Sequence, residues 1–227
     1  MLETIRYFVQ NGSFVFVCFL HFTKAFDTVN YAKLYDVLSS RGIDTVFLRA
    51  IFRGYLAQSA KIDWNGCFSN IFQISNGVRQ GGILSPYFFA CYLDGITQAD
   101  LYNGMGCWFG TCFAGVVAYA DDVVLLCPSL HGLRFMLEKA NDFASSLDLN
   151  FNPSKSAAVR FGSPFLKQFS LSVNGEQIPW KNNVIHLGFH ISCDLSDEMR
   201  CSYLVRDFFL QDAMVCSPHF LDFLQTF

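Results

Sequence analysis

The tetrapeptide Tyr119-Ala120-Asp121-Asp122 constrains the fold of this chain more than any other segment, because it places two adjacent carboxylates between apolar residues. Residues 113–118 before it are all small or apolar, and residues 123–127 after it are apolar throughout. Buried carboxylates are costly unless they are paired or bound to a metal ion. The pattern predicts a tight β-hairpin over residues 113–127 whose turn presents the aspartates, either to a metal ion or, more simply, to solvent.

The composition indicates a folded globular protein. The chain has 227 residues, of which 52% are hydrophobic and 26 are phenylalanine, enough for one domain and part of a second. The nine cysteines show no CxxC or similar spacing, and no signal peptide is evident, so reduced thiols and an intracellular location are expected, in the nucleus or the cytoplasm. The apolar run 14–20 is far shorter than the ~20 residues that span a bilayer, so no membrane association is expected.

Net charge bears on the kind of partner. The formal net charge is -3, whereas free-standing nucleic-acid binders are usually basic. Any contact with nucleic acid is therefore expected to depend on a local groove or on other parts of a larger protein.

Helices are predicted where a capping residue precedes an apolar periodic segment. The predicted helices, each with its cap, are 31–41 after Asn30, 45–58 after Asp44, 87–101 after Ser85-Pro86, and 130–147 after Ser129. A further helix is predicted from about residue 196.

Strands are predicted from β-branched and aromatic runs and from turn dipeptides. They are 14–20, 61–64 and 71–74 around Asn65-Gly66, the 113–127 hairpin, 149–151, 157–161, 170–173 and 177–180 around Asn174-Gly175, and 184–191. This order of elements predicts an α+β (mixed α/β) fold, with a small antiparallel sheet and helices packed on one face.

Five motifs stand in a fixed order along the chain. They are Phe19-Leu20-His21-Phe22-Thr23-Lys24-Ala25-Phe26-Asp27, Ser75-Asn76-Gly77-Val78-Arg79-Gln80-Gly81-Gly82-Ile83-Leu84-Ser85-Pro86, Tyr119-Ala120-Asp121-Asp122, Asn152-Pro153-Ser154-Lys155-Ser156 and His186-Leu187-Gly188. On these motifs, residues 14–200 resemble the reverse transcriptase of non-LTR (LINE-type) retrotransposons. The resemblance implies a polymerase-type palm and RNA-directed DNA polymerase activity, with Mg²⁺ or Mn²⁺ as cofactor and an RNA template, a DNA primer and dNTPs as partners.

The resemblance also implies the metal ligands, and here the chain departs from the family. Asp121 and Asp122 match the catalytic, metal-binding aspartates of the family, but His21 stands where the pattern FLDxxKAFD has the third carboxylate. An imidazole suits transition metals better than Mg²⁺. Metal-ion stabilisation is worth several kcal/mol and each 1.4 kcal/mol is about tenfold in rate, so severely impaired polymerisation is expected. Alternatively, His21 is an ordinary strand-end histidine with a satisfied hydrogen bond, or a ligand of a site adapted to Mn²⁺ or Zn²⁺.

Other roles carry over from the family, each beside a simpler interpretation. Phe26 resembles the aromatic gate under the sugar, and is otherwise a core phenylalanine. Gln80, Gly81 and Gly82 resemble the loop against template and incoming nucleotide, and are otherwise a loop before a helix. Arg79 could reach a phosphate. Lys155 resembles a catalytic lysine near the departing pyrophosphate. Leu187 and Gly188 resemble the primer grip. Arg79 and Lys155 are otherwise surface cations, and His186 replaces the usual tyrosine of the grip.

The expected domain organisation is a palm-like domain over residues 1–195, with the fingers largely missing, followed by the truncated helical start of a thumb or connection region over residues 196–227. Loss of the third carboxylate leaves a second hypothesis open. In it, the chain is a catalytically inactive retroelement relic or a domesticated module that binds nucleic acid or protein.

Overall fold

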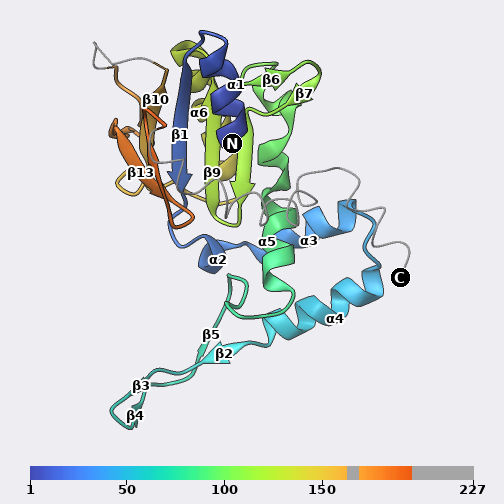
Figure 1. Cartoon of the computed structure of the whole chain (residues 1–227). Helices are drawn as coiled ribbons and strands as arrows, with labels where there is room; N and C mark the ends of the chain where they lie inside the picture. The colour runs from blue at the N-terminus through green and yellow to red at the C-terminus, as the bar shows by residue number, and fades with distance from the viewer. Residues whose placement is uncertain (163–168, 196–227) are drawn as a thin grey trace. The chain divides into compact units, whose positions relative to one another are not determined.

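The computed structural model describes residues 1–162 and 169–195 of the chain (Figure 1). It divides into two compact units, Met1–Lys181 and Asn182–Phe227. The helix expected from residue 196 onward lies outside the described residues.

The first unit contains six helices among its described residues, together with two 3₁₀ turns. Their bounds are α1 Leu2–Gln10, α2 Ala25–Thr28, α3 Tyr31–Ser40, α4 Thr45–Leu56, α5 Ser85–Leu93, α6 Leu130–Ser146, η1 Asp94–Thr97 and η2 Ala99–Tyr102. The strands of this unit are β1 Val15–His21, β2 Ser59–Ala60, β3 Asp63–Trp64, β4 Cys67–Phe68, β5 Phe72–Gln73, β6 Trp108–Phe109, β7 Cys112–Phe113, β8 Val116–Tyr119, β9 Asp122–Cys127, β10 Ala157–Phe161, β11 Ser172–Val173 and β12 Glu176–Gln177.

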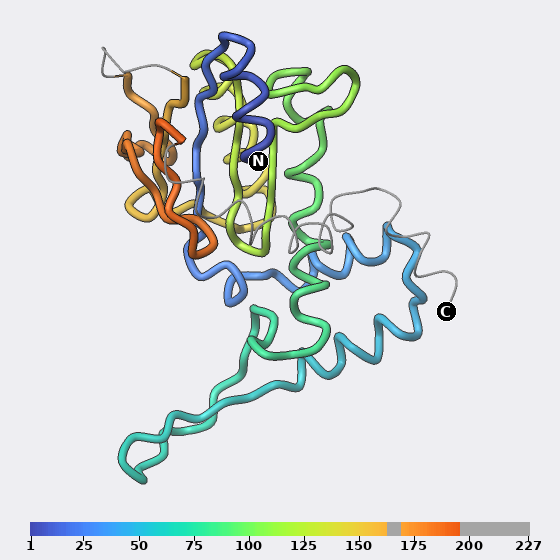
Figure 2. The backbone as a smooth tube through the Cα atoms, in the orientation of Figure 1, coloured from blue at the N-terminus to red at the C-terminus, as the bar shows by residue number. Residues whose placement is uncertain are grey.

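A four-stranded antiparallel sheet organises the first unit. Its strand order is β10-β1-β9-β8, so β1 lies between β10 and the β8–β9 hairpin (Figures 1 and 2). The register pairs His21 with Asp122 and Tyr119 with Asp122. The C-terminal end of β1 and the turn of the hairpin therefore meet at the same edge of the sheet.

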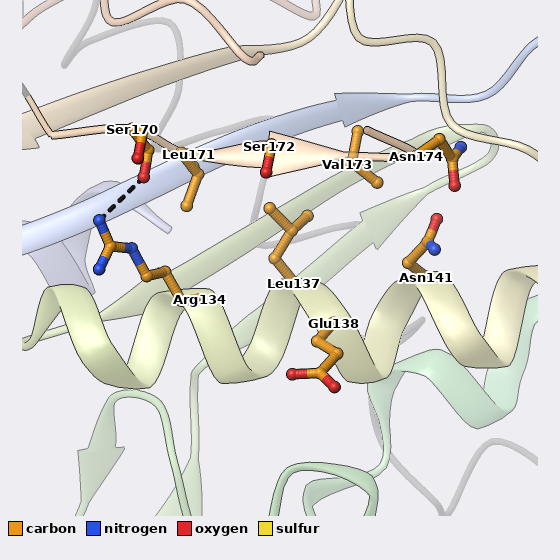
Figure 3. A pocket seen from close by; sticks show the side chains of 9 residues that line it. All are labelled: Arg134, Leu137, Glu138, Asn141, Ser170, Leu171, Ser172, Val173 and Asn174. Carbon is orange, nitrogen blue, oxygen red and sulfur yellow. Dashed lines mark hydrogen bonds between the residues drawn. The ribbon is translucent and has the colours of Figure 1, made fainter. Parts of the chain in front are cut away.

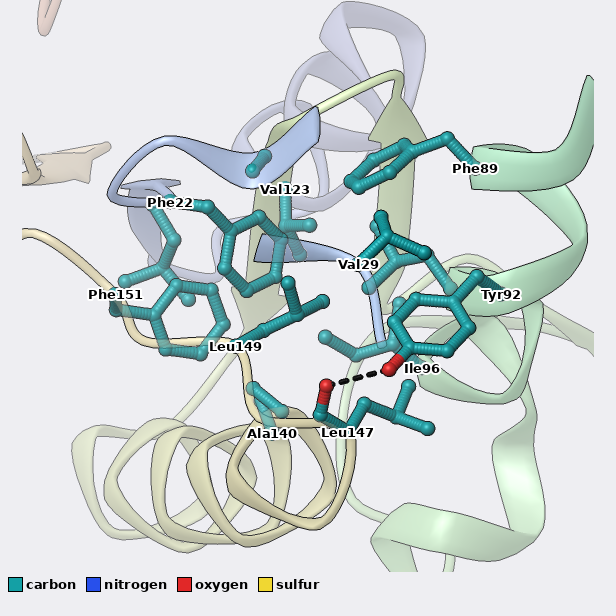
Figure 4. Packing of buried hydrophobic residues seen from close by; sticks show 14 of the residues in the cluster. Phe22, Val29, Phe89, Tyr92, Ile96, Val123, Ala140, Leu147, Leu149 and Phe151 are labelled. Atoms are coloured by element: carbon teal, nitrogen blue, oxygen red, sulfur yellow. Dashed lines mark hydrogen bonds between the residues drawn. The ribbon is translucent and has the colours of Figure 1, made fainter. Parts of the chain in front are cut away.

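The main core lies on one face of this sheet, as the apolar pattern predicts. Phe16, Cys18 and Leu20 alternate along β1 and belong to one buried cluster with residues of β9, α5 and α6. Figure 4 shows part of this cluster, where the Tyr92 hydroxyl donates a hydrogen bond of 2.6 Å to the Leu147 carbonyl. Burial raises the pKa of Tyr92 to about 12. On the other side, α1 lies against β1 and its Ile5 is fully buried.

The predicted caps at Asn30 and Asp44 are confirmed. The Asn30 side chain accepts hydrogen bonds from the amides of Ala32 and Lys33, and Asp44 does the same for the two amides at the start of α4. These contacts satisfy amides that have no partner inside a helix.

The predicted cap at Ser85 is wrong. Ser85 is the first residue of α5, its side chain is buried, and its hydroxyl has no hydrogen-bond partner among the described residues. The helix also ends at Leu93 and not near residue 101, and the 3₁₀ turns follow. Gly95 lies at this break, where a Cβ atom would come within 2.6 Å of the Phe143 ring. Close packing against α6 therefore requires glycine at a position where glycine weakens a helix.

The segment between α4 and α5 forms an interrupted hairpin. The sequence predicts two strands, but the structure has two short pairs, β2 with β5 and β3 with β4. Asn65 and Gly66 form the turn, with φ of 51° and 82°, as expected for a two-residue hairpin turn. Figures 1 and 2 show this hairpin extending from the end of α4 away from the central sheet.

Three further strand predictions have different outcomes. The hairpin around Asn174-Gly175 is present as β11 and β12, and the strand predicted at 157–161 is β10. The strand predicted at 149–151 is reduced to a single bridge between Phe22 and Phe151, and the two rings stack there with their centroids 4.4 Å apart.

The second unit contains one hairpin among its described residues. Its strands are β13 Asn183–His186 and β14 Phe189–Ser192, which pair antiparallel. Leu187 and Gly188 form the turn with φ of 50° and 80°.

Among the described residues, no helix has the length and apolarity needed to cross a bilayer.

Candidate active site

The acidic tetrapeptide forms the turn between β8 and β9, as predicted. Tyr119 and Asp122 are the last paired residues, so Ala120 and Asp121 make a two-residue turn. Ala120 has φ of 51°, which is a left-handed conformation that residues with a side chain rarely adopt. Strained backbone of this kind gathers at functional sites. The turn places Asp121 at the tip and Asp122 at the start of β9, facing β1.

His21 lies directly across the strand pair from Asp122. The His21 Nδ1 atom is 2.6 Å from the Asp122 Oδ1 atom, and the two side chains are 34% and 17% exposed. The histidine therefore has a hydrogen-bond partner, as the simpler interpretation of this position requires, although that interpretation did not say which residue it would be. The Oδ1 atom of Asp122 is therefore in contact with the imidazole of His21 on the neighbouring strand β1.

The electrostatics of Asp122 follow from this arrangement. Burial raises the pKa of the Asp122 carboxyl, His21 lowers it, and the charge of Asp121 raises it again, with a net shift upward from its ordinary value. An upward shift means that the site disfavours the ionised form. The neighbouring imidazole offsets only part of this unfavourable effect.

The residues present do not fit a two-metal site. Mg²⁺ takes oxygen ligands in near-octahedral geometry, yet the edge of the sheet offers the carboxylates of Asp121 and Asp122 and an imidazole in the third place. Within residues 1–162 and 169–195, no cluster of three or more histidine, cysteine, aspartate or glutamate side chains is placed to hold a metal ion.

The loop that contains Arg79, Gln80, Gly81 and Gly82 is bound to the segment after β1. The amide of Gly77 donates to the Val29 carbonyl at 2.9 Å, and the amide of Val78 donates to the Phe26 carbonyl at 2.8 Å. The Tyr31 hydroxyl donates to the Gly77 carbonyl at 2.9 Å. A Cβ atom on Gly77 would lie 2.8 Å from the Asp27 carbonyl oxygen, so only glycine allows this approach.

This contact brings two sets of predicted site residues together. Arg79, Gln80 and Gly81 are exposed in the middle of the loop between β5 and α5, and Phe26 lies in the segment to which the loop is bonded. The half-buried Phe26 ring stacks on Phe89 of α5, with centroids 4.6 Å apart and planes at 19°. Phe26 is thus both a member of the core and a fixed ring beside the loop.

Lys155 lies in a turn that is bonded to the end of β1. The amide of Asn152 donates to the His21 carbonyl at 2.7 Å, and the amide of His21 donates to the Ser156 hydroxyl at 3.3 Å. The Asn152 side chain closes the turn by accepting bonds from Ser154 and from the Lys155 amide. Lys155 itself is exposed.

Sequence analysis assigned no role to Ser156. This residue is fully buried, and its hydroxyl donates to the Asn152 carbonyl at 2.8 Å while accepting from His21. Ser156 therefore fixes the end of β1 to the turn that carries Lys155. The signal available in the sequence was the Asn-Pro-Ser turn pattern itself, which favours such local bonds.

Leu187 and Gly188 belong to the second unit, where they are the turn residues of the β13–β14 hairpin. The contacts described above join residues of the first unit only.

A pocket between α6 and β11 is separate from these residues (Figure 3). It is lined by Arg134, Leu137, Glu138, Asn141, Ser170, Leu171, Ser172, Val173 and Asn174. Arg134 closes one end by donating a hydrogen bond of 2.9 Å to the Ser170 carbonyl. None of the predicted site residues lines this pocket, so it gives no support to their roles.

Comparison with known proteins identifies the family. Residues 4–191 match the family described as reverse transcriptase (RNA-dependent DNA polymerase). Over 170 residues, the chain is 30% identical to the retrovirus-related Pol polyprotein from type-2 retrotransposable element R2DM of Drosophila melanogaster, covering 72% of this chain and 16% of that protein. It is 22% identical over 199 residues to the RNA-directed DNA polymerase from mobile element jockey of Drosophila funebris, covering 84% of this chain and 21% of that protein.

The fold is also that of known polymerases. An apo telomerase structure from Candida tropicalis, truncated from its C-terminal domain, matches with a TM-score of 0.57 at 12% identity, over 85% of this chain and 37% of the other. The polymerase-type palm predicted from the sequence is confirmed. The chain spans less than a quarter of the length of the two curated relatives named above. Over most of its own length, the chain belongs to the reverse transcriptase family, in the branch of the non-LTR retrotransposons.

Proposed function

We propose that this chain is the palm of an RNA-directed DNA polymerase in which nucleotide addition is strongly reduced. The observation that supports the reduction is the 2.6 Å contact between His21 Nδ1 and Asp122 Oδ1. In an active palm, carboxylates from β1 and from the hairpin turn would converge on divalent ions, Mg²⁺ or Mn²⁺, which stabilise the charge that develops at the reacting phosphate. Here His21 supplies no carboxylate and occupies an oxygen of Asp122.

The remaining site residues would bind the substrates. Phe26 would lie under the sugar of an incoming dNTP, and its stacking on Phe89 supports a fixed ring there. Gln80, Gly81 and Gly82 would contact the template and the nucleotide, since their loop is bonded to the Phe26 segment. Arg79 would meet a phosphate.

Two further roles concern the primer and the leaving group. Lys155 would lie near the departing pyrophosphate, and the bonds between its turn and the end of β1 support that placement. Leu187 and Gly188 would contact the primer, by resemblance to the family.

The partners of this function are an RNA template, a DNA primer and dNTPs. Family membership supports them, and one structural neighbour is a telomerase in complex with a fragment of telomeric RNA. In the relatives, the matched region is a small share of a much longer protein. The binding of template, primer and dNTPs by this chain is therefore proposed here and not transferred from those proteins.

Addition of a single nucleotide tests the reduced activity. The unaltered chain and an Asp121→Asn variant are given a primed RNA template, dNTP and Mg²⁺, and extension is followed on a gel. Because the unaltered chain already has an incomplete carboxylate set, we expect its rate to lie within about tenfold of the variant's rate, a difference of about 1.4 kcal/mol. Robust extension by the unaltered chain, abolished by Asp121→Asn, would contradict the reduction.

A further inference from the structure

The helix α4 and the hairpin β2–β5, residues 45–73, carry an unusual distribution of charge. We refer to this segment as the arm. It contains three basic residues, Arg49, Arg53 and Lys61, and one acidic residue, Asp63, although the whole chain has a net charge of -3. All three basic residues are exposed. The arm is therefore locally positive in an acidic protein.

The arginines of the arm have no counter-charge among the described residues, in contrast to several other cations of the chain. Arg49 and Arg53 form no ion pair with any residue in the ranges that the structure describes, whereas Lys33, Arg41 and Lys139 lie 2.8 to 3.9 Å from carboxylates. Asp63 forms no ion pair with these arginines among the described residues, and its carboxylate accepts a hydrogen bond of 3.0 Å from the Gly66 amide in the turn. Exposed and unpaired cations, one turn apart on a helix, suit a chain of phosphates.

Aromatic and aliphatic side chains stand exposed on the same arm. Trp64 is 76% exposed, Ile62 58% and Phe72 47%. Successive side chains of a strand alternate between faces, so Ile62 and Trp64 lie on one face of the hairpin. On the other face the Lys61 ammonium lies 3.8 Å from the Phe68 ring centroid. An exposed indole on the same segment as exposed cations is the combination on which unpaired bases stack while their backbone meets positive charge.

We propose that the arm binds an unpaired strand of RNA, with Arg49, Arg53 and Lys61 against phosphates and Trp64 stacked on a base. The choice of RNA rests on the proposed function, in which an RNA template enters the palm. The arm lies outside the carboxylate edge of the sheet, so this binding needs neither the metal site nor the chemical step. RNA is favoured over a second copy of the chain because it carries one negative charge at every phosphate, whereas a second copy would present a net charge of only -3.

Fluorescence anisotropy with a labelled 20-nucleotide oligouridine, in EDTA and without dNTPs, tests this proposal on the full chain. The double variant Arg49→Gln/Arg53→Gln is expected to bind about tenfold more weakly in 50 mM KCl. It should also flatten the dependence of log affinity on log salt by about 1.4, since each phosphate contact with a single strand contributes about 0.7. Trp64→Ala is expected to bind about tenfold more weakly with the salt dependence unchanged, because stacking carries no charge.

The controls separate this proposal from the proposed function and from misfolding. Lys139→Gln removes a paired cation of α6 and should bind RNA as the unaltered chain does. Circular dichroism melting should be the same for the arm variants and the unaltered chain, because Arg49, Arg53 and Trp64 are exposed. The proposal would be overturned if the arm variants bound RNA as tightly as the unaltered chain, or if the unaltered chain did not bind RNA. It would also be overturned by a Trp64→Ala variant that changes from dimer to monomer in sedimentation while keeping its RNA affinity. Since no nucleotide is added in this assay, a chain that fails in primer extension can still bind RNA through the arm.

Discussion

The variant His21→Asp is expected to add a deoxynucleotide to a primer on an RNA template, with Mg²⁺, at least about a hundredfold faster than the unaltered chain. The substitution places a carboxylate at the end of β1, across the strand pair from Asp122 and beside Asp121. It also releases the Asp122 oxygen that His21 Nδ1 now contacts. Metal-ion stabilisation is worth several kcal/mol, and ~3 kcal/mol corresponds to about a hundredfold. Single-turnover extension measures the effect.

Two matched variants identify the cause of any gain. His21→Asn removes the imidazole without supplying a charged oxygen ligand, so it should remain close to the unaltered chain. Adding Asp121→Asn to His21→Asp should abolish the gain, because the new carboxylate acts together with the hairpin pair. An equal gain in His21→Asn would show that removal of the histidine, and not the new carboxylate, is responsible.

The variant Gly77→Ala is expected to lower the free energy of unfolding by about 3 kcal/mol, through backbone strain and overpacking together. Gly77 has φ of 91°, and a Cβ atom there would lie 2.8 Å from the Asp27 carbonyl oxygen and 3.0 Å from the Asp27 Cα atom. Relief requires the loop to move away from the segment after β1. Such movement breaks the bonds from Gly77 and Val78 to the Val29 and Phe26 carbonyls. Urea denaturation measures the loss.

Gly66→Ala is the matched control for this steric effect. Gly66 has φ of 82°, close to that of Gly77, but a Cβ atom there would have no neighbour within 4 Å. Only the conformational penalty remains, so a loss of about 1 kcal/mol is expected. If the two variants lower the free energy of unfolding by the same amount, the close approach of Gly77 to Asp27 does not account for the loss in Gly77→Ala.

The parts of the fold predicted correctly from the sequence are those with local signals. Asn30 and Asp44 cap the helices that follow them because the bonded amides are two or three residues away. Asn65-Gly66 and Asn174-Gly175 turn because their own backbone preferences suit a two-residue hairpin. In each case the atoms that decide the conformation are neighbours in the sequence.

Predictions failed where a distant part of the chain decides the outcome. The end of α5 depends on the contact of Gly95 with Phe143 of another helix. Among the described residues, the buried hydroxyl of Ser85 has no hydrogen-bond partner, and this favourable capping residue does not cap the helix. Capping residues and the spacing of apolar residues along the sequence contain no information about these tertiary contacts.

In the candidate site too, local features were predicted from the sequence and tertiary contacts were not. Its residue types were predicted from the motif resemblance, including the replacement of a carboxylate by His21. The contact between His21 and Asp122 was not predicted, because it depends on the register of two strands about 100 residues apart in sequence. The bonds of Ser156 and Asn152 to the end of β1 depend on the same tertiary arrangement.

We propose that the His21–Asp122 pair stands where an active palm would have its Mg²⁺ site. The most direct measurement is the melting temperature of the unaltered chain and of His21→Asp during a titration with Mg²⁺, because a ligand that binds the folded state stabilises it. We expect Mg²⁺ to leave the unaltered chain unchanged and to raise the melting temperature of His21→Asp in a saturable way that Asp121→Asn abolishes. Saturable stabilisation of the unaltered chain by Mg²⁺, lost on Asp121→Asn, would contradict the claim.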